Sequence, residues 1–351
     1  MLRNYNGLAD INNTIEKEAT EIVSRDGLSY LDSVWATGGT PRLKRVFSDL
    51  ALRDRPKALR LINDDKLRFP VLFILMADIG ALNMFDGLNR RNLTAINICS
   101  RKIYKYDIEA VTANTLDRDV QFQTLKWMFD TGKDWGGPRD GHDPYDAVID
   151  YTAALLITEY EVKEVLRDVA DMIFRRNRQG LYIHDLVWSF FQTLDRDALA
   201  IVAGYLLTNN PKDAELAVKL LGIEAPTPMD RGEARKIYRQ FLDWLNENKP
   251  YLYLTGEQFQ MTSIPKHMDA NREAKYLGKE ISPRYRAPVE PLTEYEIECL
   301  RRYREAPPED QALLADYSHK LRGRDALLWY EWIGKQTAQQ VATAKMTREV
   351  I

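Results

Sequence analysis

Hydrophobic residues recur every three to four positions along most of the chain, with polar and charged residues between them. This spacing places the hydrophobic side chains on one face of an α-helix. A clear example is the run Leu199, Val202, Ala203 and Leu206. No stretch alternates hydrophobic and polar residues over the length of a strand, and residues 251–254 alone fit one short strand. The pattern predicts an all-α protein.

Residues typical of helix ends support this prediction. Asp143-Pro144 and Asn210-Pro211 each place a capping side chain before a proline at the first helical position. Residues 158–161 and 293–296 share the sequence Thr-Glu-Tyr-Glu, which is typical of a capping box at a helix start. Gly222 is suited to end the last central helix in the left-handed conformation. The central helices are predicted at 144–157, 159–176, 182–194, 196–209 and 211–221.

A short pair of amphipathic helices cannot bury its hydrophobic face alone, so stacked pairs are expected. The two starts at Asp143 and Asn210 lie about two helical-hairpin repeats apart. We therefore predict an irregular array of helical hairpins, similar in its helix spacing and caps to HEAT-like and other α-solenoid proteins. A long irregular excursion and a C-terminal helical subdomain complete the predicted fold.

Two breaks in the helical pattern divide the chain. Residues 134–142 contain three glycines and a proline, which rule out a continuous helix. Residues 251–290 have scattered prolines and weak periodicity, with one short helix expected near 271–277, and loops this long are usually functional. The predicted parts are an N-terminal helical domain (1–133), a glycine-rich loop (134–143), a central helical-hairpin array (144–222), a linker and helix (223–250), an irregular segment (251–290) and a C-terminal helical subdomain (291–351).

Composition is that of a folded protein, with 45% hydrophobic and 29% charged residues. The net charge of −3 does not by itself require a nucleic acid or an anionic membrane as partner. Two cysteines exclude a disulfide framework and favour a reducing compartment. The most hydrophobic stretch, 69–82, carries Asp78 and is shorter than the roughly 20 residues that span a bilayer. No secretory signal pattern stands at residues 1–10, and we expect a soluble, cytoplasmic protein.

Catalytic and metal-binding motifs are not evident. The four histidines have no second histidine or cysteine at metal-ligand spacing, and no nucleophile-elbow motif is present. The sequence therefore predicts no catalytic residue, no cofactor and no metal, and favours a protein that is not an enzyme. His142-Asp143 and His184 leave open the alternative of an enzyme with a polar pocket near residues 142–185.

The leading prediction is a protein–protein interaction or assembly protein, because helical arrays mostly present extended surfaces to partners. Its setting is hypothesised to be a larger complex, such as a phage-like or mobile-element assembly, with a protein partner or self-assembly. The contacts are expected in the glycine-rich loop and the irregular segment, where aromatic residues and an arginine can act as binding hot spots. The candidate residues are Trp135, Arg139, Tyr253, Phe259, Tyr276 and Tyr285.

A second alternative is a nucleic-acid-binding helical-repeat protein. Between residues 42 and 68 there are nine basic and four acidic residues, an excess that could track a phosphate backbone. The acidic residues are interspersed, which is also typical of a solvated helix face. The basic candidates are Arg42, Lys44, Arg45, Arg53, Lys57 and Arg60.

Overall fold

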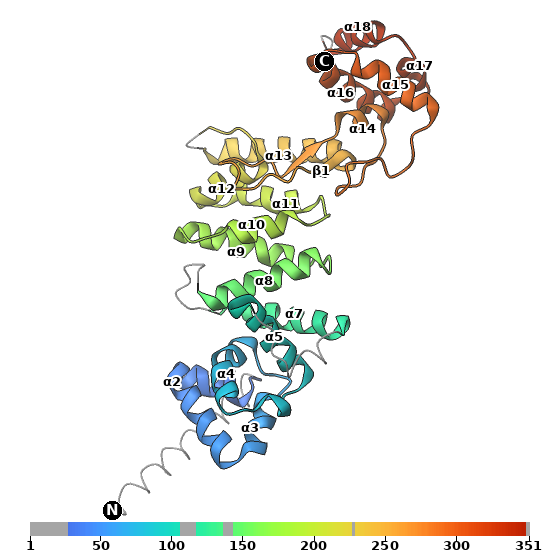
Figure 1. Cartoon of the computed structure of the whole chain (residues 1–351). Helices are drawn as coiled ribbons and strands as arrows, with labels where there is room; N and C mark the ends of the chain where they lie inside the picture. Colours follow the sequence, from blue (N-terminus) through green and yellow to red (C-terminus); the bar gives the residue numbers. More distant parts are fainter. Residues whose placement is uncertain (1–26, 106–116, 136–142, 227–228, 349–351) are drawn as a thin grey trace, which may run out of the picture. The chain divides into compact units, whose positions relative to one another are not determined.

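The computed structural model describes residues 27–105, 117–135, 143–226 and 229–348. These residues form 16 α-helices, three short 3-10 helices and one two-stranded antiparallel hairpin (Figure 1). The predicted all-α class is confirmed, with the hairpin as a small addition. None of the helices in these ranges is long and apolar enough to cross a membrane.

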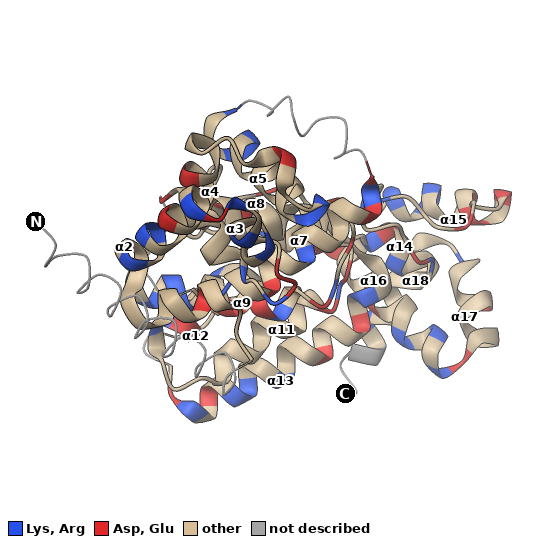
Figure 2. Ribbon diagram, turned by 90° about the horizontal axis from the view of Figure 1, so that it is seen from below, with Lys and Arg blue, Asp and Glu red and all other residues tan. Residues whose placement is uncertain are grey.

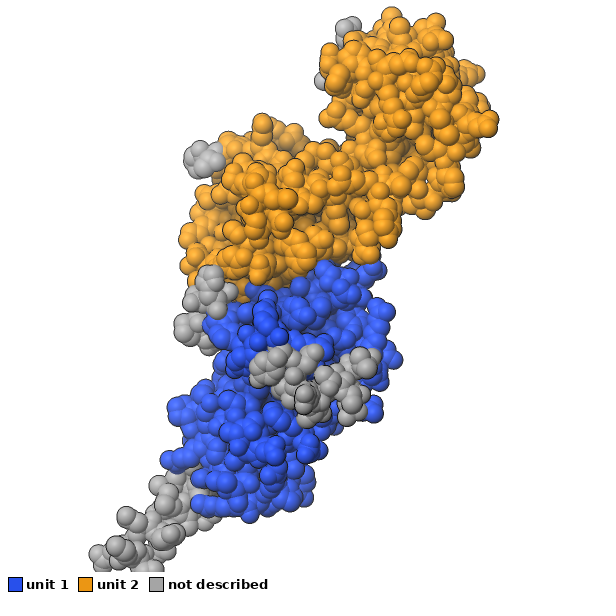
Figure 3. Space-filling model, viewed as in Figure 1, with its two compact units in different colours: residues 1–168 blue, residues 169–351 orange. Residues whose placement is uncertain are grey.

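The chain divides into two compact units, residues 1–168 and 169–351 (Figure 3). The division falls inside one helix, α9 (Leu166–Gln179). The predicted loop boundary at 134–143 includes residues 136–142, which lie outside the described residues.

The described part of the first unit is built from helices. The hydrophobic helix α4 has Phe69, Leu72 and Leu75 buried and packs against α2 and α7, so the most hydrophobic stretch of the chain forms a core helix. Its α-helices are α2 (Tyr30–Arg53), α3 (Arg55–Ile62), α4 (Phe69–Ala81), α5 (Arg90–Tyr104), α7 (Arg118–Gly132) and α8 (Pro144–Thr158), with the 3-10 helix η1 at Phe85–Gly87.

The second unit contains α9 to α18 and the hairpin. Strands β1 and β2 pair antiparallel, with Leu252 opposite Ala270, which confirms the short strand expected at 251–254. The elements after α9 are α10 (His184–Phe191), α11 (Ala198–Gly204), η2 (Tyr205–Leu207), α12 (Pro211–Leu221), α13 (Arg231–Asn248), η3 (Lys249–Tyr251), β1 (Leu252–Leu254), β2 (Met268–Ala270), α14 (Arg272–Leu277), α15 (Glu294–Arg304), α16 (Pro308–Arg324), α17 (Ala326–Ile333) and α18 (Thr337–Arg348).

Most of the predicted helix caps are observed. Asp143 accepts a hydrogen bond from the backbone N–H of Asp146, Asn210 caps α12, and Gly222 ends α12 with a φ of 61°. The two Thr-Glu-Tyr-Glu sequences differ. At 293–296 the capping box is complete, whereas Thr158 is the last residue of α8 and α9 begins only at Leu166. The predicted helix start at residue 159 is therefore wrong.

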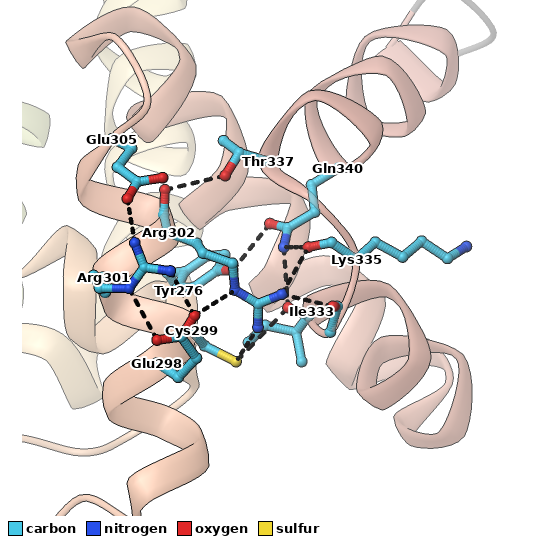
Figure 4. A network of polar contacts seen from close by, with 11 residues as sticks. Tyr276, Glu298, Cys299, Arg301, Arg302, Glu305, Ile333, Lys335, Thr337 and Gln340 are labelled. Carbon is cyan, nitrogen blue, oxygen red and sulfur yellow. Dashed lines mark hydrogen bonds and ion pairs between the residues drawn. The ribbon is translucent and has the colours of Figure 1, made fainter.

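The last helices enclose a separate hydrophobic core around Tyr276 and Trp332, which are both almost fully buried. Figure 4 shows polar contacts that tie this core together. The Tyr276 hydroxyl donates to Gln340 Oε1 (2.9 Å), and the Arg302 guanidinium donates to the carbonyl of Gly334 (2.7 Å). The polar sequence from residue 336 onward predicts fraying, but α18 buries Gln340 and Ala344 against its neighbours, so that expectation is wrong for 337–348.

Candidate protein-binding surface

The segment 251–290 is mostly loop, but its backbone is held at several points. The hairpin pairs its first residues, Leu252–Leu254, with Met268–Ala270 near its middle, and the N–H of Leu254 donates to the carbonyl of Pro283 (3.0 Å). A further antiparallel bridge joins Ile281 to Pro288. The short helix α14 lies where a helix was predicted, with Asn271 as its N-cap. The segment is therefore a shaped strap, and we use that name for residues 251–290.

Buried polar residues fix the strap to α13 and α16. Tyr251 is buried, which raises the pKa of its phenol, and its hydroxyl lies 3.1 Å from Nδ1 of His319. The Lys275 ammonium group is buried and donates to Asn248 Oδ1 (2.8 Å) and to Asp316 Oδ1 (2.6 Å). A buried lysine with both contacts satisfied fixes the position of its helix, because breaking either contact leaves a buried polar group unpaired.

Arg196, an arginine outside the strap, donates hydrogen bonds to three carbonyl groups at the base of the strap. The guanidinium of Arg196 donates to the carbonyls of Pro250 (3.4 Å), Leu252 (3.3 Å) and Ile281. It also forms an ion pair with Glu280 (2.8 Å), and the Arg196 side chain is only 11% exposed. A planar guanidinium suits this role because its five N–H donors point in fixed directions.

We expect Arg196→Met to loosen the strap. The methionine keeps most of the apolar side-chain volume but removes every donor, and hydrogen bonds to charged groups typically contribute about 1.5–3 kcal/mol. Amide hydrogen exchange should accelerate across residues 250–289 and stay unchanged in α11 and α12. Arg239→Met, at an exposed arginine of α13, is the control. Unchanged exchange in the strap of the Arg196 variant would contradict this role.

A second arginine holds the strap from within. Arg286 donates to the carbonyls of Leu254 (3.0 Å) and Thr255 (2.8 Å), and its guanidinium lies over the Tyr253 ring at 4.7 Å from the ring centre. Its φ is 58°, a left-handed conformation that is uncommon for a residue with a side chain. These contacts position Tyr253 beneath Arg286 and fix the turn at 282–289.

The fixed strap exposes four large hydrophobic side chains, which we call the apolar tips: Met261 (70% exposed), Ile264 (59%), Tyr285 (75%) and Val289 (64%). The backbone of an ordered loop loses little conformational freedom when a partner covers its hydrophobic side chains. Loops held by a rigid scaffold are also where binding residues concentrate. The apolar tips are thus suited to contact a partner.

A groove of about 350 Å³ lies beside the base of the strap. Ile237, Phe241 and Trp244 of α13 form one side, and Lys266 and Met268 of the strap form another. Trp244 is 37% exposed, so its ring is accessible at the groove. The hydrophobic wall can accept an apolar side chain from a partner, and the polar side chains of Glu224, Gln240 and Lys266 also line the groove.

The predicted contact residues fall into different environments. Tyr285 is exposed, whereas Tyr253 and Phe259 are half-buried, Phe259 against His184 at 5.3 Å between ring centres. Tyr276 is completely buried, so a partner cannot reach its ring, and its role is in the core. This placement corrects its inclusion among surface residues.

The glycine-rich loop contributes one described candidate. The candidate Trp135 is half-buried, packs edge-on against Tyr145 (4.2 Å) and lies near Trp35 (5.8 Å). Its ring therefore belongs to an aromatic cluster of the first unit. Arg139 lies outside the described residues.

The basic candidates lie on α2, which also carries acidic residues, and on α3, which carries none (Figure 2). Lys44 pairs with Asp78 (3.4 Å), and the nearby Arg68 pairs with the buried Asp32 (2.8 Å). Part of the local basic excess thus serves ion pairs within the unit. Of the six candidates, Arg45, Arg53 and Arg60 are exposed, while Arg42, Lys44 and Lys57 are half-buried.

The residues of the enzyme alternative have structural roles where they are described. Asp143 caps α8, and His184 packs against the rings of Tyr182 (5.1 Å) and Phe259. The neighbouring Asp185 accepts a hydrogen bond from the Tyr182 hydroxyl (2.9 Å). His142 lies outside the described residues.

Sequence patterns did not single out Arg196, Arg286 or the tips Met261, Ile264 and Val289. Each arginine acts on carbonyl groups that are brought close only by the fold, so no spacing in the chain signals its role. The exposed hydrophobic residues of the strap lie in a stretch without helical periodicity, which weakly indicates that they do not belong to a helix core.

Comparison of this chain with protein-family models, with curated proteins and with solved structures gives no match. Function is therefore inferred from the strap, the groove and the charges around them.

Proposed function

We propose that this chain is a non-enzymatic protein-interaction or assembly protein whose partner binds the strap and the adjoining groove. The observation that carries the proposal is a loop segment that is pinned by Arg196 and Arg286 and yet exposes four large hydrophobic tips. Exposed hydrophobic side chains mark a protein-binding site where one partner covers several of them together.

The apolar tips can contribute energy to the binding of a partner. Complete burial of one large hydrophobic side chain contributes about 1.5–3 kcal/mol. Association of two proteins costs several kcal/mol in lost rotational and translational freedom, and only the surplus appears as affinity. The four tips together with the exposed part of Trp244 can supply that surplus if one partner covers them.

The helical-array fold is part of the same proposal. Within the second unit, α11 packs against both α12 and α13, so consecutive helices contact their near neighbours in the chain. This local packing supports a HEAT-like array, in which each helical layer contacts mainly the next. We also propose that the protein belongs to a larger assembly of phage-like or mobile-element type.

Affinity capture from the native cells tests the proposal. The wild-type chain should recover a stoichiometric protein partner that survives nuclease treatment. The double variant Tyr285→Ser, Val289→Ser should lower this recovery at least about tenfold, since each loss of buried apolar surface weakens binding by about 1 kcal/mol or more. Leu327→Ser is the matched control, because Leu327 is 83% exposed but lies outside the strap, on α17.

Two outcomes would sink the proposal. Equal recovery by the strap variant and by the Leu327 variant would place the contact elsewhere. Recovery that collapses with nuclease would instead favour the nucleic-acid alternative, in which Arg45, Arg53 and Arg60 contact phosphates.

A further inference from the structure

A second concave site lies on the strap near Tyr253. It is a shallow pocket of about 350 Å³ between the start of α14, the turn that carries Arg286, and Gln311 of α16. Its lining is strongly polar and includes Arg272 and Arg286, the amide side chains of Asn271 and Gln311, and two acidic residues, Asp269 and Glu273. A pocket of this size admits a single side chain or a small molecule.

Both acidic residues of the pocket are already neutralised. Arg304 forms a two-pronged ion pair with Glu273, with both N–O distances at 2.7 Å. Lys266 pairs with Asp269 at 2.6 Å. Neither carboxylate is therefore left to balance an arginine of the pocket.

The two arginines of the pocket have no such balance. Among the described residues Arg272 forms no ion pair. Arg286 donates to two backbone carbonyls and lies over the Tyr253 ring, and neither of these contacts supplies a negative charge. The pocket thus holds two positive charges that no acid of the described chain neutralises. Its amide side chains are engaged within the chain, since Asn271 donates to the carbonyl of Arg286 and Gln311 donates to the carbonyl of Ala306.

A carboxylate is the anionic group that the side chains of a protein partner would present to these charges. Guanidinium groups bind a planar carboxylate through paired hydrogen bonds. A phosphate ester at neutral pH carries more charge than one carboxylate, or, in a nucleic acid, belongs to a continuous row of charges. Guanidinium groups also bind phosphate in a bidentate manner, so the titrations described below decide between the two anions.

We propose that this pocket binds an acidic side chain, Asp or Glu, presented by the protein that covers the apolar tips. This inference rests on the proposed function, because it specifies the chemistry of the same partner. Tyr285 precedes Arg286 in the chain, so the partner segment that covers this apolar tip passes beside the pocket. The acidic group then fixes the register of the partner segment on the strap.

The test uses the full chain and an acetylated, amidated tetraglutamate peptide, followed by NMR titration to millimolar concentrations. Shifts should appear at Asn271, Arg272 and Arg286, and the matched tetraglutamine peptide should cause none. Arg272→Gln should weaken binding at least about tenfold, the loss expected for a charge-assisted hydrogen bond. Arg272→Lys should weaken it less, and Arg239→Gln, at an exposed arginine of α13, should leave it unchanged.

The inference is overturned if tetraglutamate causes no shifts at the pocket, or if Arg272→Gln leaves its affinity unchanged. It is also overturned if inorganic phosphate or a single-stranded oligonucleotide binds the pocket more tightly than tetraglutamate. The proposed function would still stand after any of these results if the double variant Tyr285→Ser, Val289→Ser recovers less of the partner than the wild type does. The reverse result, tetraglutamate binding without a strap-dependent partner, contradicts the proposed function and, with it, the role of a partner's acidic side chain in this pocket.

Discussion

Tyr276→Ala lowers the free energy of unfolding of the C-terminal core by about 3–5 kcal/mol, the cost typical of truncating a large buried aromatic residue. Its ring is completely buried, stacks on Tyr303 with 4.5 Å between ring centres, and contacts Trp332 edge-on. The cavity left behind would lie between α14, α15 and α17, which the surrounding helices can close only in part.

Two further variants separate the contributions to this loss. Tyr276→Phe keeps the ring but leaves Gln340 Oε1 without its donor, so we expect a loss of about 1 kcal/mol. Tyr285→Ala, on the exposed surface, should change stability by less than about 0.5 kcal/mol. Chemical denaturation measures all three, and a small loss in the Tyr276→Ala variant would show that this core is not packed as described.

Unfolding free energy falls as the pH is lowered from 6.5 towards 4, because of His267. The imidazole is 4% exposed, lies flat on Phe191 at 3.8 Å, and its Nε2 has no hydrogen-bond partner among the described residues. Burial lowers its pKa from 6.5 to about 4, against the smaller opposing effects of a hydrogen bond to the backbone of Glu257 and of the Glu257 carboxylate. The folded protein therefore keeps His267 in its neutral form.

The sign of the pH effect follows from this depressed pKa. Above pH 6.5 the imidazole is neutral in both states, and the stability of the folded form is complete. Between pH 6.5 and pH 4 the unfolded chain takes up a proton that the folded chain does not, so stability is lost as the pH falls. The loss approaches the order of 3 kcal/mol at the acid end of this window.

Denaturation at several pH values, compared with a His267→Phe variant, isolates this contribution. Phenylalanine retains the stack on Phe191 and cannot be protonated, so the slope of stability between pH 4 and pH 6.5 should become shallower. His184→Phe is the control, since His184 is only half-buried on α10. An identical slope in wild type and the His267 variant would refute the role assigned to this residue.

The parts of the fold that depend on local sequence were predictable. Asp143 and Asn210 cap helices because their short side chains reach the backbone a few residues away, and this needs no tertiary contact. The helix at residues 69–81 follows from its hydrophobic length and its initial proline. Such features are set within one or two helical turns.

Features that depend on tertiary packing were not predictable. The identical sequence Thr-Glu-Tyr-Glu ends one helix and begins another, because Thr158 donates its hydroxyl to the carbonyl of Ala154 whereas Thr293 accepts from Glu296. Tyr276 and Tyr285 have similar surroundings in the sequence. Helix α14 nevertheless places Tyr276 in the core, and the turn at 282–289 leaves Tyr285 exposed. Local composition does not distinguish these outcomes.

The candidate site was predictable as a region but not in its individual residues. Weak periodicity and prolines marked residues 251–290 as unusual, and the strap lies there. Its rigidity comes from Arg196, more than fifty residues earlier, which reaches carbonyls at 250, 252 and 281. No spacing rule connects such distant positions, so only the folded chain reveals them.

Photo-crosslinking from the strap tests the central claim most directly. p-Benzoylphenylalanine in place of Tyr285 should crosslink to one protein from native cells, in a nuclease-resistant product. The same group in place of Leu327, which is also exposed but lies on α17, should not. A product formed equally from both positions, or from position 327 alone, would contradict the account of the strap as the partner-binding surface.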